Sequence, residues 1–218
     1  MLKNFKDNSI EPGQESESIN IKNWTRQEVL KDSRFYFLLP TILCPPFLIT
    51  GIFINQIYLF ESTGWGINFL APSFTAYAIF TVISLQVSGY LIDKFSALKV
   101  LPFYLIPMIL GLIFSITFKF TLSPVLFFVL IAVTNGTANV LITSTWSEMY
   151  GTKFLGAIRS VTISLMVFST SLSPILFGIL IDLGLGSKEI MISMLIYAVF
   201  SILLMLLKIK SYKPTISS

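Results

Sequence analysis

Charged residues are almost absent from the middle of the chain. Of the 26 charged residues, 12 lie in residues 1–34 and 3 lie in residues 208–218, so the 173 residues between them carry only 11. A soluble domain carries about 25% charged residues. Only a helix or a closed barrel spans a bilayer, because every backbone polar group must be satisfied within the protein. The long apolar runs here fit helices, and we predict an all-α membrane protein with its transmembrane bundle in residues 35–207.

The apolar middle region divides into six segments. A transmembrane helix needs about 20 mostly apolar residues, and cutting the region where charge and turn residues coincide gives 35–60, 71–92, 100–118, 124–147, 157–181 and 190–207. We expect six transmembrane helices joined by short loops. Residues 1–34 are expected to form a largely disordered tail or linker, and residues 208–218 a second tail. Within the first, Thr25 and Glu28 have the spacing of a helix capping box.

Lysine and arginine are distributed unevenly between the two sides of this predicted bundle. With six spans both termini lie on one side, and that side holds 13 of the 15 basic residues: Lys3, Lys6, Lys22, Arg26, Lys31, Arg34, Lys94, Lys99, Lys153, Arg159, Lys208, Lys210 and Lys213. Because basic loops stay in the cytoplasm, we predict cytoplasmic termini and an integral multi-pass protein of the cell membrane. The same excess accounts for the basic pI, so nucleic acid is not an expected partner.

Several classes of chemistry lack the residues that they need. The chain has no histidine, which excludes a Ser-His-Asp triad, a His-ligated zinc and a haem held by histidine. Cys44 is the single cysteine, so it cannot form an intramolecular disulfide or a CxxC redox pair. We therefore predict that the protein is not an enzyme and uses no metal or other cofactor.

A short pattern occurs twice. Gly89-Tyr-Leu-Ile-Asp93 and Gly178-Ile-Leu-Ile-Asp182 each close an apolar span, and they lie 89 residues apart, which corresponds to three spans. Because three is odd, the second copy is inverted in the membrane. An inverted 3+3 repeat is typical of secondary transporters. The alternative is a chance match among apolar residues, since glycine is common near helix ends.

These patterns resemble the C-terminal six-helix half of the major facilitator superfamily. Gly89-Tyr-Leu-Ile-Asp93-Lys94 followed by Lys99 is similar to the family signature between the second and third helices of a half, although Ser96 stands where that signature has glycine. Residues 147–157 and 173–182 resemble later segments of the same half. Residues 24–35 resemble the start of the second half in bacterial monocarboxylate and oxalate/formate carriers.

The resemblance implies a fold, a mechanism and partners. It makes the chain half of a carrier that moves a small solute by alternating access, with a small organic anion and a coupling ion as the solutes. A full carrier has two such halves. The expected protein partner is therefore a missing N-terminal half or a second copy of this chain, beside the lipid bilayer.

Charged and small residues at the cytoplasmic ends of the spans form a candidate gate. Its members are Gly89, Asp93, Lys94, Glu148, Lys153 and Arg159. Gly89 is expected to permit close helix approach, which places Asp93 at the positive end of the fifth span. Glu148 is expected to complete an ion-pair latch with Lys153 and Arg159. The alternative is static anchoring at the membrane interface.

Polar residues in mid-membrane concentrate on the first and fourth spans and form a candidate substrate pathway. Its members are Asn55, Gln56, Asn135, Asn139, Thr143 and Trp146. Asn135 and Asn139 are four residues apart and share a helix face, and the resemblance implies that both spans line a central cavity. The alternative is that the amides hold helices together by hydrogen bonds. A transporter is thus the leading hypothesis, and a non-transporting membrane packing or assembly module is the alternative.

Overall fold

The described part of the protein is built from helices. The computed structural model describes residues 22–118 and 120–212, and within these ranges it contains no strand. Five helices are long and apolar enough to cross a membrane: α2 (Ser33–Ile54), α4 (Leu70–Phe95), α7 (Ser123–Tyr150), α8 (Leu155–Asp182) and α9 (Ser187–Leu207). The protein is therefore an all-helical, multi-pass membrane protein, which confirms the predicted fold class of an all-α membrane protein.

Two of the six predicted spans are interrupted. The first is divided at Asn55 into α2 and α3 (Gln56–Thr63). The third consists of α5 (Ala97–Val100), a turn at residues 101–105, and the 12-residue α6 (Ile106–Thr117). Pro102 and Pro107 have no N–H to donate, which explains why a regular helix does not run through this segment. The remaining short elements are α1 (Arg26–Lys31), η1 (Ile67–Phe69) and η2 (Ile209–Ser211).

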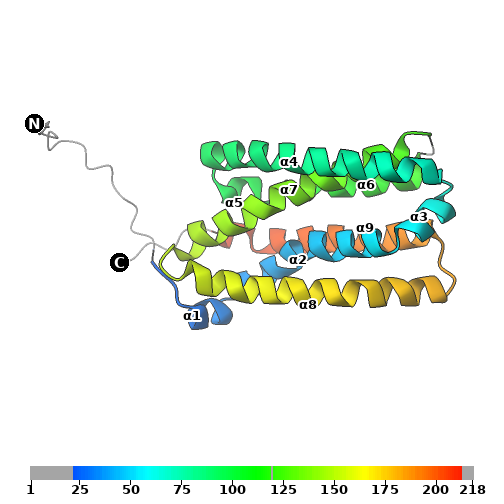
Figure 1. The fold of residues 1–218 in the computed structure, drawn as a ribbon. Coiled ribbons are helices and arrows are strands. Elements are labelled where there is room, and N and C mark those ends of the chain that lie inside the picture. Colours follow the sequence, from blue (N-terminus) through cyan, green and yellow to red (C-terminus); the bar gives the residue numbers. More distant parts are fainter. Residues whose placement is uncertain (1–21, 119, 213–218) are drawn as a thin grey trace, which may run out of the picture.

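Helices α2 and α7 form the centre of the bundle. They contact each other, α4 and α6 pack on α7, and α8 and α9 pack on α2. Helices α6 and α9 also contact one another. In Figure 1, α4 and α8 lie on opposite outer sides of this arrangement. The core residues come mainly from α2, α7 and α9, while most of the surface of α4 and α8 is exposed.

Glycines on the central helices allow the outer helices to approach closely. A Cβ atom at Gly136 on α7 would lie 2.0 Å from the Ser84 hydroxyl oxygen and 2.4 Å from the Thr81 carbonyl oxygen, both on α4. A Cβ at Gly51 on α2 would lie 2.5 Å from the Phe177 ring on α8. At Gly89 a Cβ would meet nothing within 4 Å. The close approach that the sequence predicts at Gly89 therefore occurs at Gly136 instead, because the residues of α4 that face α7 lie elsewhere on the helix.

Hydroxyl groups supply hydrogen bonds between the helices. The Thr41 hydroxyl on α2 donates to the Ser201 carbonyl on α9 at 2.7 Å. Pro45 leaves the Thr41 carbonyl without its helical donor, and the Tyr104 hydroxyl donates to that carbonyl. On α6 the free N–H of Met108 donates to the Thr134 hydroxyl of α7 at 3.0 Å. The bonds of Tyr104 and Met108 each satisfy a backbone group that a proline or a helix break would leave unpaired inside the membrane.

Residues 22–34 include the short helix α1, whereas residues 1–21, on which the prediction of disorder mainly falls, lie outside the described residues. The predicted capping box is present, since the Glu28 N–H donates to the Thr25 hydroxyl and Glu28 accepts from the Thr25 N–H. The Trp24 N–H donates to the Tyr150 carbonyl at the end of α7 at 2.9 Å. Contacts to α7 thus hold this segment against the bundle.

Acidification is expected to remove the cap of α1. Hydrogen bonds from the Thr25 backbone and from Lys22 lower the pKa of Glu28 from 4.5 to about 2. Because the folded value lies below the unfolded one, the contribution of the cap is complete above about pH 4.5 and is lost as the pH falls towards 2. An NMR titration of the Glu28 carboxyl carbon measures this pKa directly. A midpoint at the unperturbed value would contradict the capping box.

Candidate functional site

A cleft of about 190 Å³ lies between α7 and α8. The residues that line it are Ala138, Asn139, Ile142, Thr143, Trp146, Arg159, Thr162, Ile163 and Met166. Three of these, Asn139, Thr143 and Trp146, belong to the predicted substrate pathway, and Arg159 belongs to the predicted gate. The structure therefore combines members of the two predicted groups in one cavity.

Trp146 places an unused hydrogen-bond donor at this cleft. Its side chain is fully buried, with ring centroids 5.3 Å from Phe35 and 5.7 Å from Tyr150. Its indole N–H is buried and has no hydrogen-bond partner in the protein. A buried donor without an acceptor costs free energy comparable to a lost hydrogen bond. The indole N–H is therefore an unsatisfied donor in the protein beside the cleft.

Arg159 gives the cleft a positive charge. It is an exposed residue on the second turn of α8, near the end of the helix where the backbone dipoles favour anions. The Thr143 side chain adds a hydroxyl to the same lining. A guanidinium, an indole N–H and a hydroxyl are all donors, so the site is suited to an acceptor-rich solute such as a carboxylate.

The amides of the predicted pathway bond within their own helices. The Asn139 side chain donates to the Asn135 carbonyl at 3.0 Å, and the Asn55 side chain donates to the Gly51 carbonyl at 3.0 Å. Neither bond joins two helices. Asn55 and Gln56 lie at the junction of α2 and α3, and neither they nor Asn135 line the cleft. Helix α7 thus supplies the predicted pathway residues of this site, while α2 supplies none.

In the conformation of this structure, no ion pair joins the predicted gate residues to one another. Glu148, Lys153 and Arg159 are all within the described residues, and no ion pair joins Glu148 to either basic residue. Asp93 is exposed. The Lys94 amine lies 5.3 Å from the centre of the Phe95 ring, and the Lys153 amine lies 5.5 Å from that of Phe154.

Glu148 instead holds the segment that follows α4. Its carboxylate accepts hydrogen bonds from the Ser96 hydroxyl at 2.6 Å and from the N–H groups of Ala97 and Leu98 at 2.7 and 3.2 Å. Ser96 has a φ of 79° and a ψ of 144°, a conformation that is almost exclusive to glycine. This is the position at which the family signature has glycine, so the backbone explains why that residue type is expected there.

No family model matches the chain, and no curated protein does. Among the described residues there is no group of three or more His, Cys, Asp or Glu side chains that would hold a metal ion.

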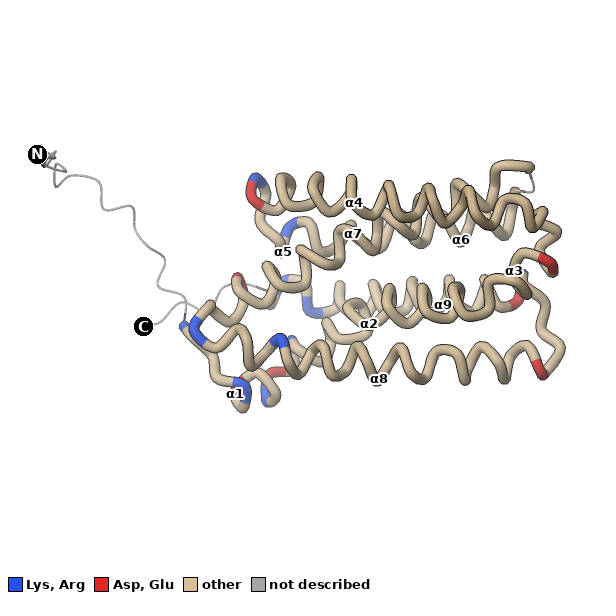
Figure 2. Tube along the Cα trace, viewed as in Figure 1, with Lys and Arg blue, Asp and Glu red and all other residues tan. Residues whose placement is uncertain are grey.

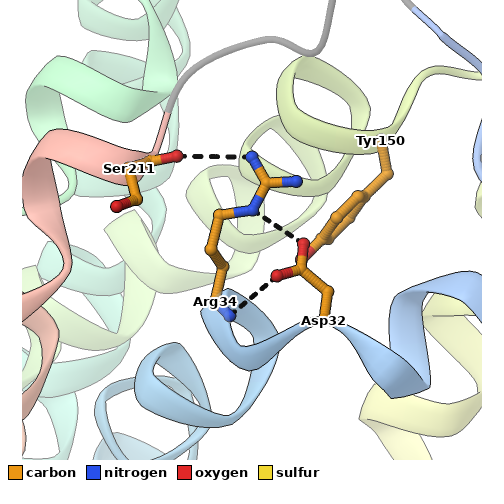
Figure 3. A network of polar contacts seen from close by, with 4 residues as sticks. All are labelled: Asp32, Arg34, Tyr150 and Ser211. Atoms are coloured by element: carbon orange, nitrogen blue, oxygen red, sulfur yellow. Dashed lines mark hydrogen bonds and ion pairs between the residues drawn. The ribbon is translucent and has the colours of Figure 1, made fainter.

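A polar network at the same end of the bundle was not predicted from the sequence. Figure 3 shows Asp32 at the N-cap of α2, Arg34 in the first turn of α2, Tyr150 at the end of α7 and Ser211 in η2. Arg34 donates to the Asp32 carboxylate at 2.7 Å and to the Ser211 carbonyl at 3.3 Å, and the Tyr150 hydroxyl donates to Asp32 at 3.1 Å. The one signal available was the mixture of polar and aromatic residues directly before the first span.

Proposed function

We propose that the chain is one six-helix half of a secondary transporter of the major facilitator type, which moves a small organic anion by alternating access. The observation that carries this proposal is the cleft between α7 and α8. There Arg159, Asn139 and Thr143 line one cavity together with Trp146, whose buried indole N–H has no partner in the protein. In a membrane, such polar groups usually mark a solute pathway.

The arrangement of the helices supports an inverted 3+3 repeat. If the first three long elements (α2, α4 and α6) are exchanged with the last three (α7, α8 and α9), the main helix contacts map onto one another. The contact of α4 with α7 becomes that of α8 with α2, and the contact of α6 with α7 becomes that of α9 with α2. In this repeat, residues 97–117 form the third span of the chain and bring the total to six. This span is interrupted by Pro102 and Pro107.

Burial follows the same repeat. At the offset of 89 residues, most positions on α4 correspond to positions on α8 with the same exposure. The buried pairs are Ser73 with Thr162 and Ser84 with Ser173, and the exposed pairs are Ile79 with Phe168, Ile83 with Leu172, Val87 with Leu176 and Tyr90 with Ile179. A chance match between two five-residue patterns would not be expected to pair buried positions with buried ones and exposed positions with exposed ones along both helices.

The charge distribution supports cytoplasmic termini. In Figure 2 the basic residues gather at the end of the bundle where α1 and α5 lie, while acidic residues occur at both ends. By the positive-inside rule, this end faces the cytoplasm.

The exposed faces of α4 and α8 support a protein partner in the membrane. Each helix carries bulky apolar side chains on one exposed side and a stripe of smaller or polar residues on another. The stripe contains Ala71, Thr75, Ala78, Gln86, Gly89 and Asp93 on α4, and Gly156, Ser160, Ser164, Ser171, Gly178 and Asp182 on α8. Small residues favour helix packing within lipid. A missing N-terminal half or a second copy of the chain would cover these stripes.

One observation favours the alternative, a non-transporting membrane packing module. Of the two helices predicted to line the pathway, only α7 contributes predicted residues to the cleft. In such a module the polar groups of the cleft would serve stability and bind no solute.

A variant that neutralises Arg159 distinguishes the transporter from the packing module. The full chain in lipid nanodiscs is titrated with acetate, lactate and oxalate by calorimetry. We expect Arg159→Gln to weaken carboxylate binding roughly tenfold, because a charge-assisted hydrogen bond is lost. Lys153→Gln is the matched control, since Lys153 is exposed and lies outside the cleft.

Asn139→Ala adds a second readout. Because the Asn139 amide bonds only within its own helix, this variant is expected to keep its unfolding temperature while binding or transport of the carboxylate falls. A wild-type chain that binds none of the three anions, or an Asn139 variant that loses stability alone, would favour the packing module.

A further inference from the structure

Helix α1 is held rigidly against the bundle at the start of the first span. Val29 is 2% exposed and packs in the core, and α1 contacts both α2 and α8. Its ends are fixed by the capping box and by Asp32, which accepts from the Arg34 N–H at 2.9 Å. Since α2 begins at Ser33, α1 lies where the chain passes from water into the membrane.

Two exposed basic residues of α1 carry uncompensated positive charge. Arg26 and Lys31 are exposed, and within the described residues no ion pair involves either. The acidic residues of the same segment have other partners. Glu28 pairs with Lys22 at 3.0 Å, and Asp32 pairs with Arg34 at 2.7 Å. Both basic side chains are therefore available to an external anion.

Apolar and aromatic surface lies next to these charges. Leu30 is 38% exposed and Tyr36 is 53% exposed, and the Tyr36 hydroxyl donates to the Leu30 carbonyl at 2.9 Å. That bond holds the tyrosine ring beside α1. Basic residues combined with an exposed leucine and an interfacial tyrosine are typical of segments that lie among lipid headgroups.

We infer that α1, through Arg26, Leu30 and Lys31 together with Tyr36, binds the headgroups of anionic phospholipids. Arg26 and Lys31, which lie on different sides of α1, would each donate to a lipid phosphate, while Leu30 and Tyr36 contact the upper part of the acyl chains. A lipid fits better than a soluble partner because α1 leads directly into α2, which places both basic residues at headgroup depth. The inference does not depend on transport.

The test uses the full chain in detergent micelles with phosphatidylglycerol or phosphatidylcholine added, and native mass spectrometry to count retained lipids. The variant Arg26→Gln/Lys31→Gln is expected to weaken retention of phosphatidylglycerol roughly 30-fold, as the loss of two phosphate contacts implies. Retention of phosphatidylcholine should not change. Lys99→Gln/Lys188→Gln is the matched control, because it removes the same charge from exposed positions outside α1.

Three outcomes would overturn the inference. Phosphatidylglycerol retention that does not differ between the α1 variant and the wild-type chain would show that α1 does not bind lipid. An equal loss in the control would assign the effect to net charge. Displacement of the lipid by millimolar inorganic phosphate would indicate a site for free phosphate. Circular dichroism of both variants confirms that exposed substitutions leave the fold intact.

Discussion

Gly136→Ala is expected to destabilise the bundle by about 2–3 kcal/mol, because overpacking a helix contact forces the two backbones apart. The added methyl would meet the Thr81 carbonyl and the Leu85 N–H of α4 at 2.4 and 3.0 Å, and neither backbone group can rotate away. The Ser84 hydroxyl, which donates to the Ala132 carbonyl at 3.3 Å, would also be displaced. Reversible unfolding in mixed micelles with increasing dodecyl sulfate, followed by circular dichroism, measures the change.

Gly178→Ala is the matched control for this prediction. Gly178 also lies inside a long apolar helix, but a Cβ there would meet nothing within 4 Å. Alanine should therefore be neutral or stabilise the helix by up to about 1 kcal/mol. Equal destabilisation by the two variants would mean that the α4–α7 contact is not as close as the structure has it.

Glu148→Ala is expected to cost about 3 kcal/mol. The carboxylate accepts three hydrogen bonds, from the Ser96 hydroxyl and from two backbone N–H groups, and bonds to a charged group are worth about 1.5–3 kcal/mol. Asp93→Ala is the control, since Asp93 is exposed, and its effect should stay within about 0.5 kcal/mol. Thermal unfolding of both variants in the same detergent compares them directly.

The backbone of Ser96 provides a sharper test of the same site. A residue other than glycine at this φ and ψ costs about 1–3 kcal/mol. In the Glu148→Ala background, Ser96→Gly should therefore recover part of the lost stability. If Asp93→Ala and Glu148→Ala cost the same and Ser96→Gly recovers nothing, Glu148 would act in a latch with other charges and not as the anchor of Ser96.

Helix positions could largely be predicted from the sequence. The predicted segment 71–92 corresponds to α4 at Leu70–Phe95, and 124–147 corresponds to α7 at Ser123–Tyr150. These helices are bounded by charged and turn residues, so their limits are local properties of the chain. The break at Asn55 has no glycine or proline to signal it, whereas Pro102 and Pro107 were visible signals for the interrupted third segment.

The candidate site was predictable only in part. Asn139, Thr143 and Trp146 share a face of one helix, and a helical spacing of three to four residues places them together without tertiary information. The position of Arg159 depends on which side of α8 packs against the bundle. It was therefore assigned to a gate with Glu148, although the structure places it in the cleft.

The chain composition already specified membrane helices, because apolar runs of this length cannot be kept in water and their backbone groups must bond within each helix. Side-chain pairings were decided by the tertiary structure. Glu148 accepts hydrogen bonds from Ser96 and the two residues that follow it. The close approach of α4 to α7 occurs at Gly136 and not at Gly89. The physical reason is that hydropathy is almost uniform around these helices, so the pattern of apolar residues does not reveal which face meets another helix and which meets lipid.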